Sequence, residues 1–239
     1  MDTPGTLGAA LLDALRLLAS GDPALLTILA RTLEVSLAAL GIATAVGLPT
    51  GAVLGLARGL PARGVVRALV YTGMGLPPVV VGLFVYLLLS RSGPLGDLGW
   101  LFSVKAMVLA QTILSVPLVV GLTMAALEGI DPELGPQLAA LGATPVQIAR
   151  TTLREARSGV LAAIAAAFGA AISEVGAVML VGGNIEGQTR VLTTAILLET
   201  RRGQFALACA LGLLLLALTF TLNFALLRAG EGRTLPRAD

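Results

Sequence analysis

The chain alternates long apolar runs with short clusters of charged residues. Four runs carry no charged side chain, and they cover Val35–Ala57, Ala68–Ser90, Ala106–Leu127 and Gly203–Leu227. Each reaches the roughly 20 residues that an α-helix needs to cross a bilayer. A fifth run, Ser158–Ile185, is also long enough and contains a single charge, Glu174. The pattern therefore predicts an all-α membrane protein with about five transmembrane helices.

The segment before the first run is amphipathic. One helical face would carry Leu7, Leu11, Leu12, Leu15 and Leu18, and the same helix holds Asp13 and Arg16. At roughly a dozen residues this helix is too short to span a bilayer. We expect residues 1–30 to form an interfacial segment and residues 31–239 to form the transmembrane domain. Packing of the segment on a neighbouring span is the alternative. The opening Asp2 does not match the basic start of a secretory signal.

Composition and charge support this class and orient the chain. Hydrophobic residues make up 56% of the sequence and charged residues 13%, with a mean hydropathy of +0.92; soluble domains contain about 25% charged residues. Three basic groups lie on one side of a five-span protein: Arg58, Arg63 and Arg67; Arg150, Arg154 and Arg157; Arg228, Arg233 and Arg237. Because positive residues favour the cytoplasmic side, we expect the N-terminus outside and the C-terminus in the cytoplasm. The net charge of +2 gives no indication of nucleic-acid binding.

The segment 128–157, between the third and fourth runs, is the one cytoplasmic stretch long enough to fold by itself. It reads "GIDPELGPQLAALGATPVQIARTTLREAR" from Gly129 onward. Asp131 before Pro132, and Thr144 before Pro145, are two helix starts of the same kind, a capping residue followed by proline. Gly142 lies between them, where a helix ends and the chain turns. Two short helices are therefore predicted to meet at Gly142 and Ala143, with an ordinary capped loop as the alternative.

The sequence lacks the usual residues of a catalytic or metal centre. It contains no histidine, which is the commonest base for a serine or cysteine nucleophile and a common zinc ligand. Cys209, the single cysteine, falls inside an apolar run. No Gly-x-x-x-x-Gly-Lys-[Ser/Thr] phosphate loop occurs, and Lys105 is the single lysine. We expect no cofactor, no metal and no enzyme activity, with any ATP hydrolysis on a separate subunit.

Several stretches resemble the permease subunits of binding-protein-dependent ABC importers. The loop "AALGATPVQIA" is similar to their cytoplasmic coupling loop, although Pro136, Gln137 and Leu138 replace its opening Glu-Ala-Ala. Arg154 and Glu155 occupy the place of its closing Leu-Pro. The stretches "GLPPVVVGLFVYLLLSRSGPLG", "AISEVGAVMLVGGNIEGQTRVLTTAILLET" and "TLREAR" resemble the molybdate, tungstate and sulfate branch, and most of all its tungstate-specific members.

The resemblance implies a type I importer permease fold, a homodimer of this chain, two ATPase subunits and an extracellular oxyanion-binding protein. It also implies that the ATPase contacts Gly142, Ala143, Thr144, Pro145, Arg154 and Glu155. A molybdate or sulfate permease is the alternative within the family, and an ion channel or a membrane enzyme is the alternative outside it.

Glu174 is the polar residue of the fourth run that most needs an explanation, because a charge at membrane depth is costly and usually faces a bundle interior or a water-filled path. A carboxylate is a poor ligand for a dianion, so we interpret Glu174 as a gate or packing partner of backbone, hydroxyls or an arginine. The predicted path or gate comprises Ser173, Glu174, Gly182, Gly183, Asn184, Arg190, Thr193 and Thr194. The glycines are expected to bend the chain where the fourth span leaves the membrane, and Arg190 is expected to meet the anion at the outer mouth. The alternatives are a lipid-buried protonated acid for Glu174 and a headgroup contact for Arg190.

Overall fold

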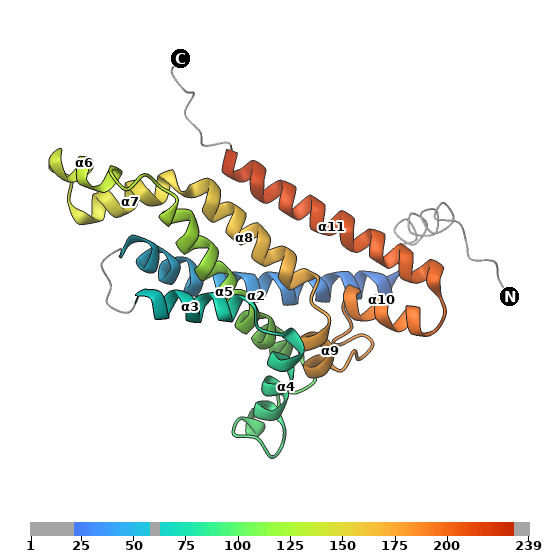
Figure 1. Cartoon of the computed structure of the whole chain (residues 1–239). Coiled ribbons are helices and arrows are strands. Elements are labelled where there is room, and N and C mark those ends of the chain that lie inside the picture. The colour runs from blue at the N-terminus through green and yellow to red at the C-terminus, as the bar shows by residue number, and fades with distance from the viewer. Residues whose placement is uncertain (1–21, 58–62, 232–239) are drawn as a thin grey trace.

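A computed structural model of the chain shows a bundle of α-helices (Figure 1). It describes residues 22–57 and 63–231, and within these ranges every regular element is a helix. The predicted all-α class is therefore confirmed. The amphipathic stretch from Leu7 to Leu18 lies outside the described residues.

The elements follow one another along the chain without long irregular connections. They are α2 (Pro23–Leu56), α3 (Arg63–Met74), α4 (Pro78–Leu89), the 3-10 turn η1 (Gly96–Leu98), α5 (Val104–Glu128), α6 (Leu134–Ala140), α7 (Pro145–Glu155), α8 (Arg157–Ile172), α9 (Gly176–Gly182), α10 (Leu192–Arg201) and α11 (Phe205–Glu231). In Figure 1, α6 and α7 lie at one end of the bundle with the end of α11. The starts of α2 and α11 lie at the opposite end with α10, and α4 and α9 lie together on one side.

The main helix pair of the bundle is α2 against α5. The buried face of α2 carries small residues at every fourth position, Ala39, Ala43, Gly47, Gly51 and Gly55. This spacing places them in one row along the helix, and small residues let two membrane helices approach closely. A Cβ atom added to Gly51 would lie 2.6 Å from the Val120 carbonyl oxygen. The sequence of α2 thus fixes where α5 can lie.

Three of the described helices, α2, α5 and α11, are long and apolar enough to cross a membrane, and the number rises to as many as five if each bent helix pair counts as one span. The predicted third and fifth runs match α5 and α11 closely. The first run belongs to a longer helix, because α2 begins at Pro23, where Asp22 Oδ1 accepts a hydrogen bond from Ala24 N at 2.8 Å. An N-cap of this kind starts a helix whatever the hydropathy of its first turns.

The prediction of one continuous helix over Ala68–Ser90 is wrong. The chain bends by 88° between α3 and α4, across Gly75–Pro77. Two consecutive prolines, Pro77 and Pro78, explain the break, because a proline lacks the N–H group that continues a helix and its ring clashes with the preceding turn. Pro78 instead occupies the first position of α4, where its missing N–H has no cost.

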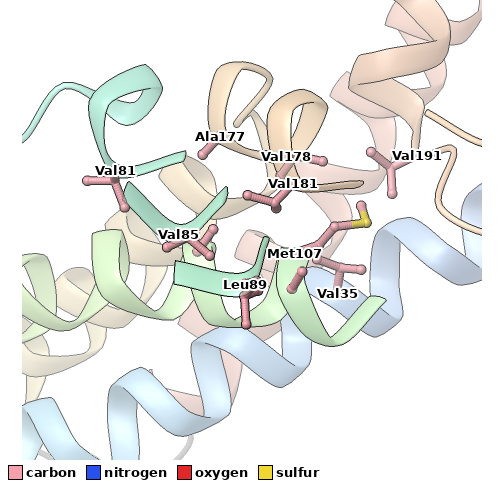
Figure 2. Packing of buried hydrophobic residues seen from close by; sticks show 11 residues of the cluster. Val35, Val81, Val85, Leu89, Met107, Ala177, Val178, Val181 and Val191 are labelled. Atoms are coloured by element: carbon pink, nitrogen blue, oxygen red, sulfur yellow. The ribbon is translucent and has the colours of Figure 1, made fainter. Parts of the chain in front are cut away.

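The predicted single span over Ser158–Ile185 is also wrong. The helix α8 ends at Ile172, the short helix α9 begins at Gly176, and Glu174 lies in the break between them. Apolar side chains of α9 pack against α4, with contributions from α5 and α2 (Figure 2). The residues of this cluster include Val35, Val81, Val85, Leu89, Met107, Ala177, Val178, Val181 and Val191. The break turns α9 sideways into a core of its own with α4, which a straight helix would not reach.

Candidate functional site

The loop between α5 and α8 folds as two short helices joined by a tight turn, as predicted. The Thr144 hydroxyl accepts a hydrogen bond from Gln147 N at 3.4 Å, and Gln147 Oε1 accepts one from Thr144 N at 2.8 Å. This reciprocal pair is a capping box, and it fixes the start of α7. Gly142 has φ +84 and closes α6, a backbone conformation that glycine adopts without strain. The second predicted cap and the turn at Gly142 are therefore confirmed.

The first predicted cap is shifted. The helix α6 begins at Leu134 rather than at Pro132, although the Asp131 carboxylate accepts a hydrogen bond from Glu133 N at 2.9 Å, the same kind of bond that Asp22 makes at the start of α2. Residues 131–133 precede the helix, and α6 has seven residues.

Two exposed apolar side chains flank the turn at Gly142. Leu141 is 84% exposed and Val146 is 77% exposed, the two largest exposed fractions among the large hydrophobic residues of the described chain. Arg154 and Glu155, at the far end of α7, are also exposed. At the end of the bundle, away from the long apolar helices, two exposed aliphatic side chains on either side of a rigid turn form a surface suited to a protein partner. Sequence reasoning found the turn and missed these two side chains, although both are visible in the sequence as apolar residues flanking "GATP".

The Glu174 side chain holds the first turn of the helix α9, whose N-cap residue is Val175. Glu174 Oε1 accepts a hydrogen bond from Ala177 N at 2.9 Å, and the Glu174 backbone carbonyl accepts one from the Thr193 hydroxyl at 3.0 Å. The Ser173 hydroxyl donates to Gly169 O at 2.7 Å and to Ala170 O at 3.2 Å, which satisfies carbonyl groups at the end of α8. Ser173, Glu174 and Thr193 thus come together, and the partners of the Glu174 carboxylate are backbone groups.

A cavity of about 240 Å³ opens beside this break. Its polar lining residues are Gln111 and Ser115 of α5 together with Glu174, and the lining also includes Leu76 of the α3–α4 break and Pro78 at the start of α4. Both helix breaks therefore border the same space. Within the described part of the chain, no arginine or lysine forms an ion pair with Glu174. The wall offers mainly hydrogen-bond acceptors, which suits water better than a free dianion.

The glycines of the fourth predicted span end α9. Gly183 and Asn184 have φ +71 and +50, so the chain reverses here, as predicted for Gly182, Gly183 and Asn184. The Thr189 hydroxyl holds the loop closed, donating to Gly182 O at 2.6 Å and accepting from Ile185 N at 2.9 Å. This bend is additional to the one at Glu174, which the glycines do not produce.

Arg190 and Thr194 lie apart from the Glu174 carboxylate. Arg190 Nη1 pairs with Glu186 Oε2 at 3.2 Å, and the arginine lines a second cavity of about 270 Å³ next to the start of α2. Thr194 Oγ1 caps α10, accepting from Val191 N at 3.1 Å and donating to Val191 O at 3.0 Å. The predicted path or gate residues therefore fall into a group at the break and a group between the end of α9 and the start of α10.

The sequence matches a known family of transport proteins. The match to the "binding-protein-dependent transport system inner membrane component" covers residues 47–230. The chain belongs to this family. A probable anion ABC transporter permease protein of Haloferax volcanii is 46% identical over 83% of this permease and 88% of its own length. A tungstate uptake system permease protein, TupB, of Peptoclostridium acidaminophilum is 40% identical over 88% and 92%. Permeases of molybdenum and sulfate transport systems are more distantly similar.

The fold of the permease also matches a solved structure. A chain of the MetNI methionine ABC transporter in an inward-facing conformation superposes with a TM-score of 0.74, covering 89% of this permease and 97% of that chain at 22% identity. The type I importer permease fold is thereby confirmed. The family places the permease in the membrane as the transport component of an ABC importer, whose ATPase is a separate subunit.

Proposed function

We propose that this permease is the pore subunit of an ATP-driven importer for an oxyanion, and that the oxyanion is tungstate. The observation that carries the proposal is the 40% identity to a tungstate uptake permease over 92% of that protein's length. The "SEVG", "VGGNI" and "TRVLTTAI" stretches, from which the resemblance to tungstate permeases was inferred, surround the break at Glu174 and the start of α10. The runner-up is a molybdate or sulfate permease of the same architecture.

The complete transporter contains two copies of this permease, two ATPase subunits and an extracellular oxyanion-binding protein. The ATPase binds the turn between α6 and α7, at Gly142, Ala143, Thr144 and Pro145. Support comes from the rigid capping box and from the exposed Leu141 and Val146 on either side of the turn. The group at the break gates the path, and Arg190 meets the anion at the outer mouth.

The substrate is tested with the whole complex reconstituted in lipid with its own binding protein and ATPase. ATP hydrolysis should be stimulated by tungstate at a lower concentration than by molybdate, and little by sulfate. Equal or stronger stimulation by sulfate would contradict the tungstate assignment and leave the permease assignment intact. No stimulation by any of the three anions would contradict the oxyanion assignment itself.

The orientation places the start of α2 outside and the end of α11 in the cytoplasm. Cysteines are introduced singly in a Cys209→Ser background, at exposed Gln188 in the outer loop and at Ala143 in the α6–α7 turn. An impermeant thiol reagent applied to intact cells should label Gln188→Cys and spare Ala143→Cys, and both should react in opened membranes. The reverse labelling would overturn the orientation and the position of the ATPase contact.

A further inference from the structure

A buried glutamine links the two helices that flank the α6–α7 loop. Gln111, near the middle of α5, is 4% exposed, and its Nε2 donates a hydrogen bond to Ala171 O at 2.9 Å. Ala171 belongs to the last turn of α8, immediately before the break that holds Glu174. Because a backbone carbonyl only accepts, the amide nitrogen must face Ala171 and the amide oxygen must face elsewhere.

The amide oxygen makes no such contact. Gln111 Oε1 is buried and has no hydrogen-bond partner among the described residues. Gln111, Ser115 and Glu174 line the same cavity of about 240 Å³, which is roomy enough for several water molecules. The one hydrogen bond that the structure shows for the Gln111 amide is therefore the bond from its nitrogen to α8.

The position of this bond along the chain gives it mechanical importance. The helix α5 leads into the α6–α7 loop and α8 leads out of it. A displacement of the loop therefore reaches the membrane through both helices. Gln111 ties them together at the level of the α8–α9 break, where the carbonyl of Ala171 also accepts a hydrogen bond from Glu174 N at 3.3 Å.

We propose that Gln111 is a positioning residue that transmits movement of the α6–α7 loop to the break at Glu174. The inference rests on the proposed function, in which an ATPase acts on that loop. Gln111 keeps α5 and the end of α8 moving together, so that the Ser173–Val175 break opens or closes only when the loop moves. Without the bond, the loop and the break move independently, and ATP hydrolysis proceeds without transport.

The test uses the complete transporter in lipid nanodiscs and proteoliposomes, with Gln111→Met as the variant. Methionine keeps the length and volume of glutamine and removes the N–H donor. The control is Thr112→Val, because Thr112 is the next residue of α5 and its hydroxyl has no hydrogen-bond partner among the described residues. Transported anion per ATP, basal ATP hydrolysis and the melting temperature are measured for both variants and the wild type.

For Gln111→Met we expect a roughly fivefold fall in anion transported per ATP and a rise in basal ATP hydrolysis, the effect of losing one hydrogen bond that holds the two helices together. Thr112→Val should match the wild type in both. A purely structural role would lower the melting temperature and leave the transport ratio of the folded complex unchanged, and that result would overturn the proposal.

A second variant covers the case in which Gln111→Met does not assemble. Gln111→Asn keeps the amide and withdraws the donor by one methylene, so it should assemble and show the same uncoupling. Normal coupling in Gln111→Asn, or failure of both variants to assemble, would overturn the proposal. A wild-type complex whose ATP hydrolysis no oxyanion stimulates would refute the proposed function instead. The basal rate of ATP hydrolysis of Gln111→Met, compared with that of the wild type, would still test this inference.

Discussion

Replacing Leu141 tests whether the α6–α7 turn is the surface that the ATPase covers. Leu141 is 84% exposed, so nearly its whole side chain is available for burial against a partner. Burying a leucine side chain fully contributes about 1.5–3 kcal/mol. Alanine keeps only the Cβ atom of that side chain, so Leu141→Ala should weaken the complex by about 1–2 kcal/mol, a rise in the Kd for the ATPase of roughly 5- to 30-fold.

The fold should not change in this variant. The backbone bond from Leu141 N to Gln137 O, which helps close α6, does not depend on the side chain. The assay is the Kd of the nanodisc-embedded permease for its ATPase, measured without nucleotide, together with the melting temperature of the permease alone. Leu216→Ala is the matched control, because Leu216 is 67% exposed and belongs to α11, outside the α6–α7 loop. An unchanged Kd for Leu141→Ala, or an equal change in both variants, would refute the docking argument.

Three further predictions concern the loop, the break and the main helix pair. Gly142→Asp should uncouple ATP hydrolysis from transport, and Gly142→Asn should have a much milder effect, because both residues tolerate φ +84 and only Asp adds a charge to the turn. The measurement is anion transported per ATP, and equal values for the two variants would contradict a role for the charge. Glu174→Gln should stay within about 0.5 kcal/mol of wild-type stability, because the side-chain amide oxygen still accepts from Ala177 N, whereas Glu174→Leu should lose about 1–2 kcal/mol with this bond. Thermal unfolding is the measurement, and an unchanged stability of Glu174→Leu would contradict the bond's role. Gly51→Ala should destabilise the bundle, because the added Cβ would meet the Val120 carbonyl. Gly41→Ala, with open space around the added Cβ, should be neutral or stabilise by about 0.5–1 kcal/mol. Similar melting temperatures for the two variants would show that α2 and α5 do not pack as described.

The features that the sequence predicted correctly are those fixed by neighbouring residues. The uncharged runs of α5 and α11 are long enough to force a helix in lipid, because each backbone group must find its partner within the segment. Thr144, Pro145 and Gln147 specify the start of α7 through contacts three residues apart.

The two helix breaks differ in how far the sequence reveals them. The bend between α3 and α4 follows from Pro77 and Pro78 and was missed because a run defined by the absence of charged side chains does not register proline. The break residues, Ser173–Val175, include no proline and no glycine, and Gly176 follows them. It is held by contacts from distant segments, Gln111 to Ala171 and Thr193 to Glu174, which are 60 and 19 residues apart in the chain. No local reading of the sequence reveals such contacts.

The candidate gate shows the same limit. Ser173 and Thr193 lie at the break with Glu174, and of the partners expected for the Glu174 carboxylate, namely backbone, hydroxyls or an arginine, the structure shows the backbone N–H of Ala177. The pairing of Arg190 with Glu186 joins residues only four apart, in a turn and not in a helix. The bond from Glu174 to Ala177 N likewise spans only three residues, yet it holds the first turn of a helix only once the break exists.

The role of Glu174 follows from what its carboxylate contacts. One oxygen is held by a backbone N–H at the start of α9, and the side chain borders a cavity shared with Gln111 and Ser115. A charge in this position repels a dianion, so it cannot contribute affinity for an oxyanion in the path. It can set where the helix breaks, and thereby which shape the cavity takes. These two views differ in a measurable way, because removing a repelling charge raises anion affinity, whereas altering this bond changes the balance between conformations. Glu174→Gln keeps the bond and removes the charge, and Glu174→Leu removes both. A change in anion stimulation shared by both variants therefore assigns the effect to charge, and a change confined to Glu174→Leu assigns it to the position of the break.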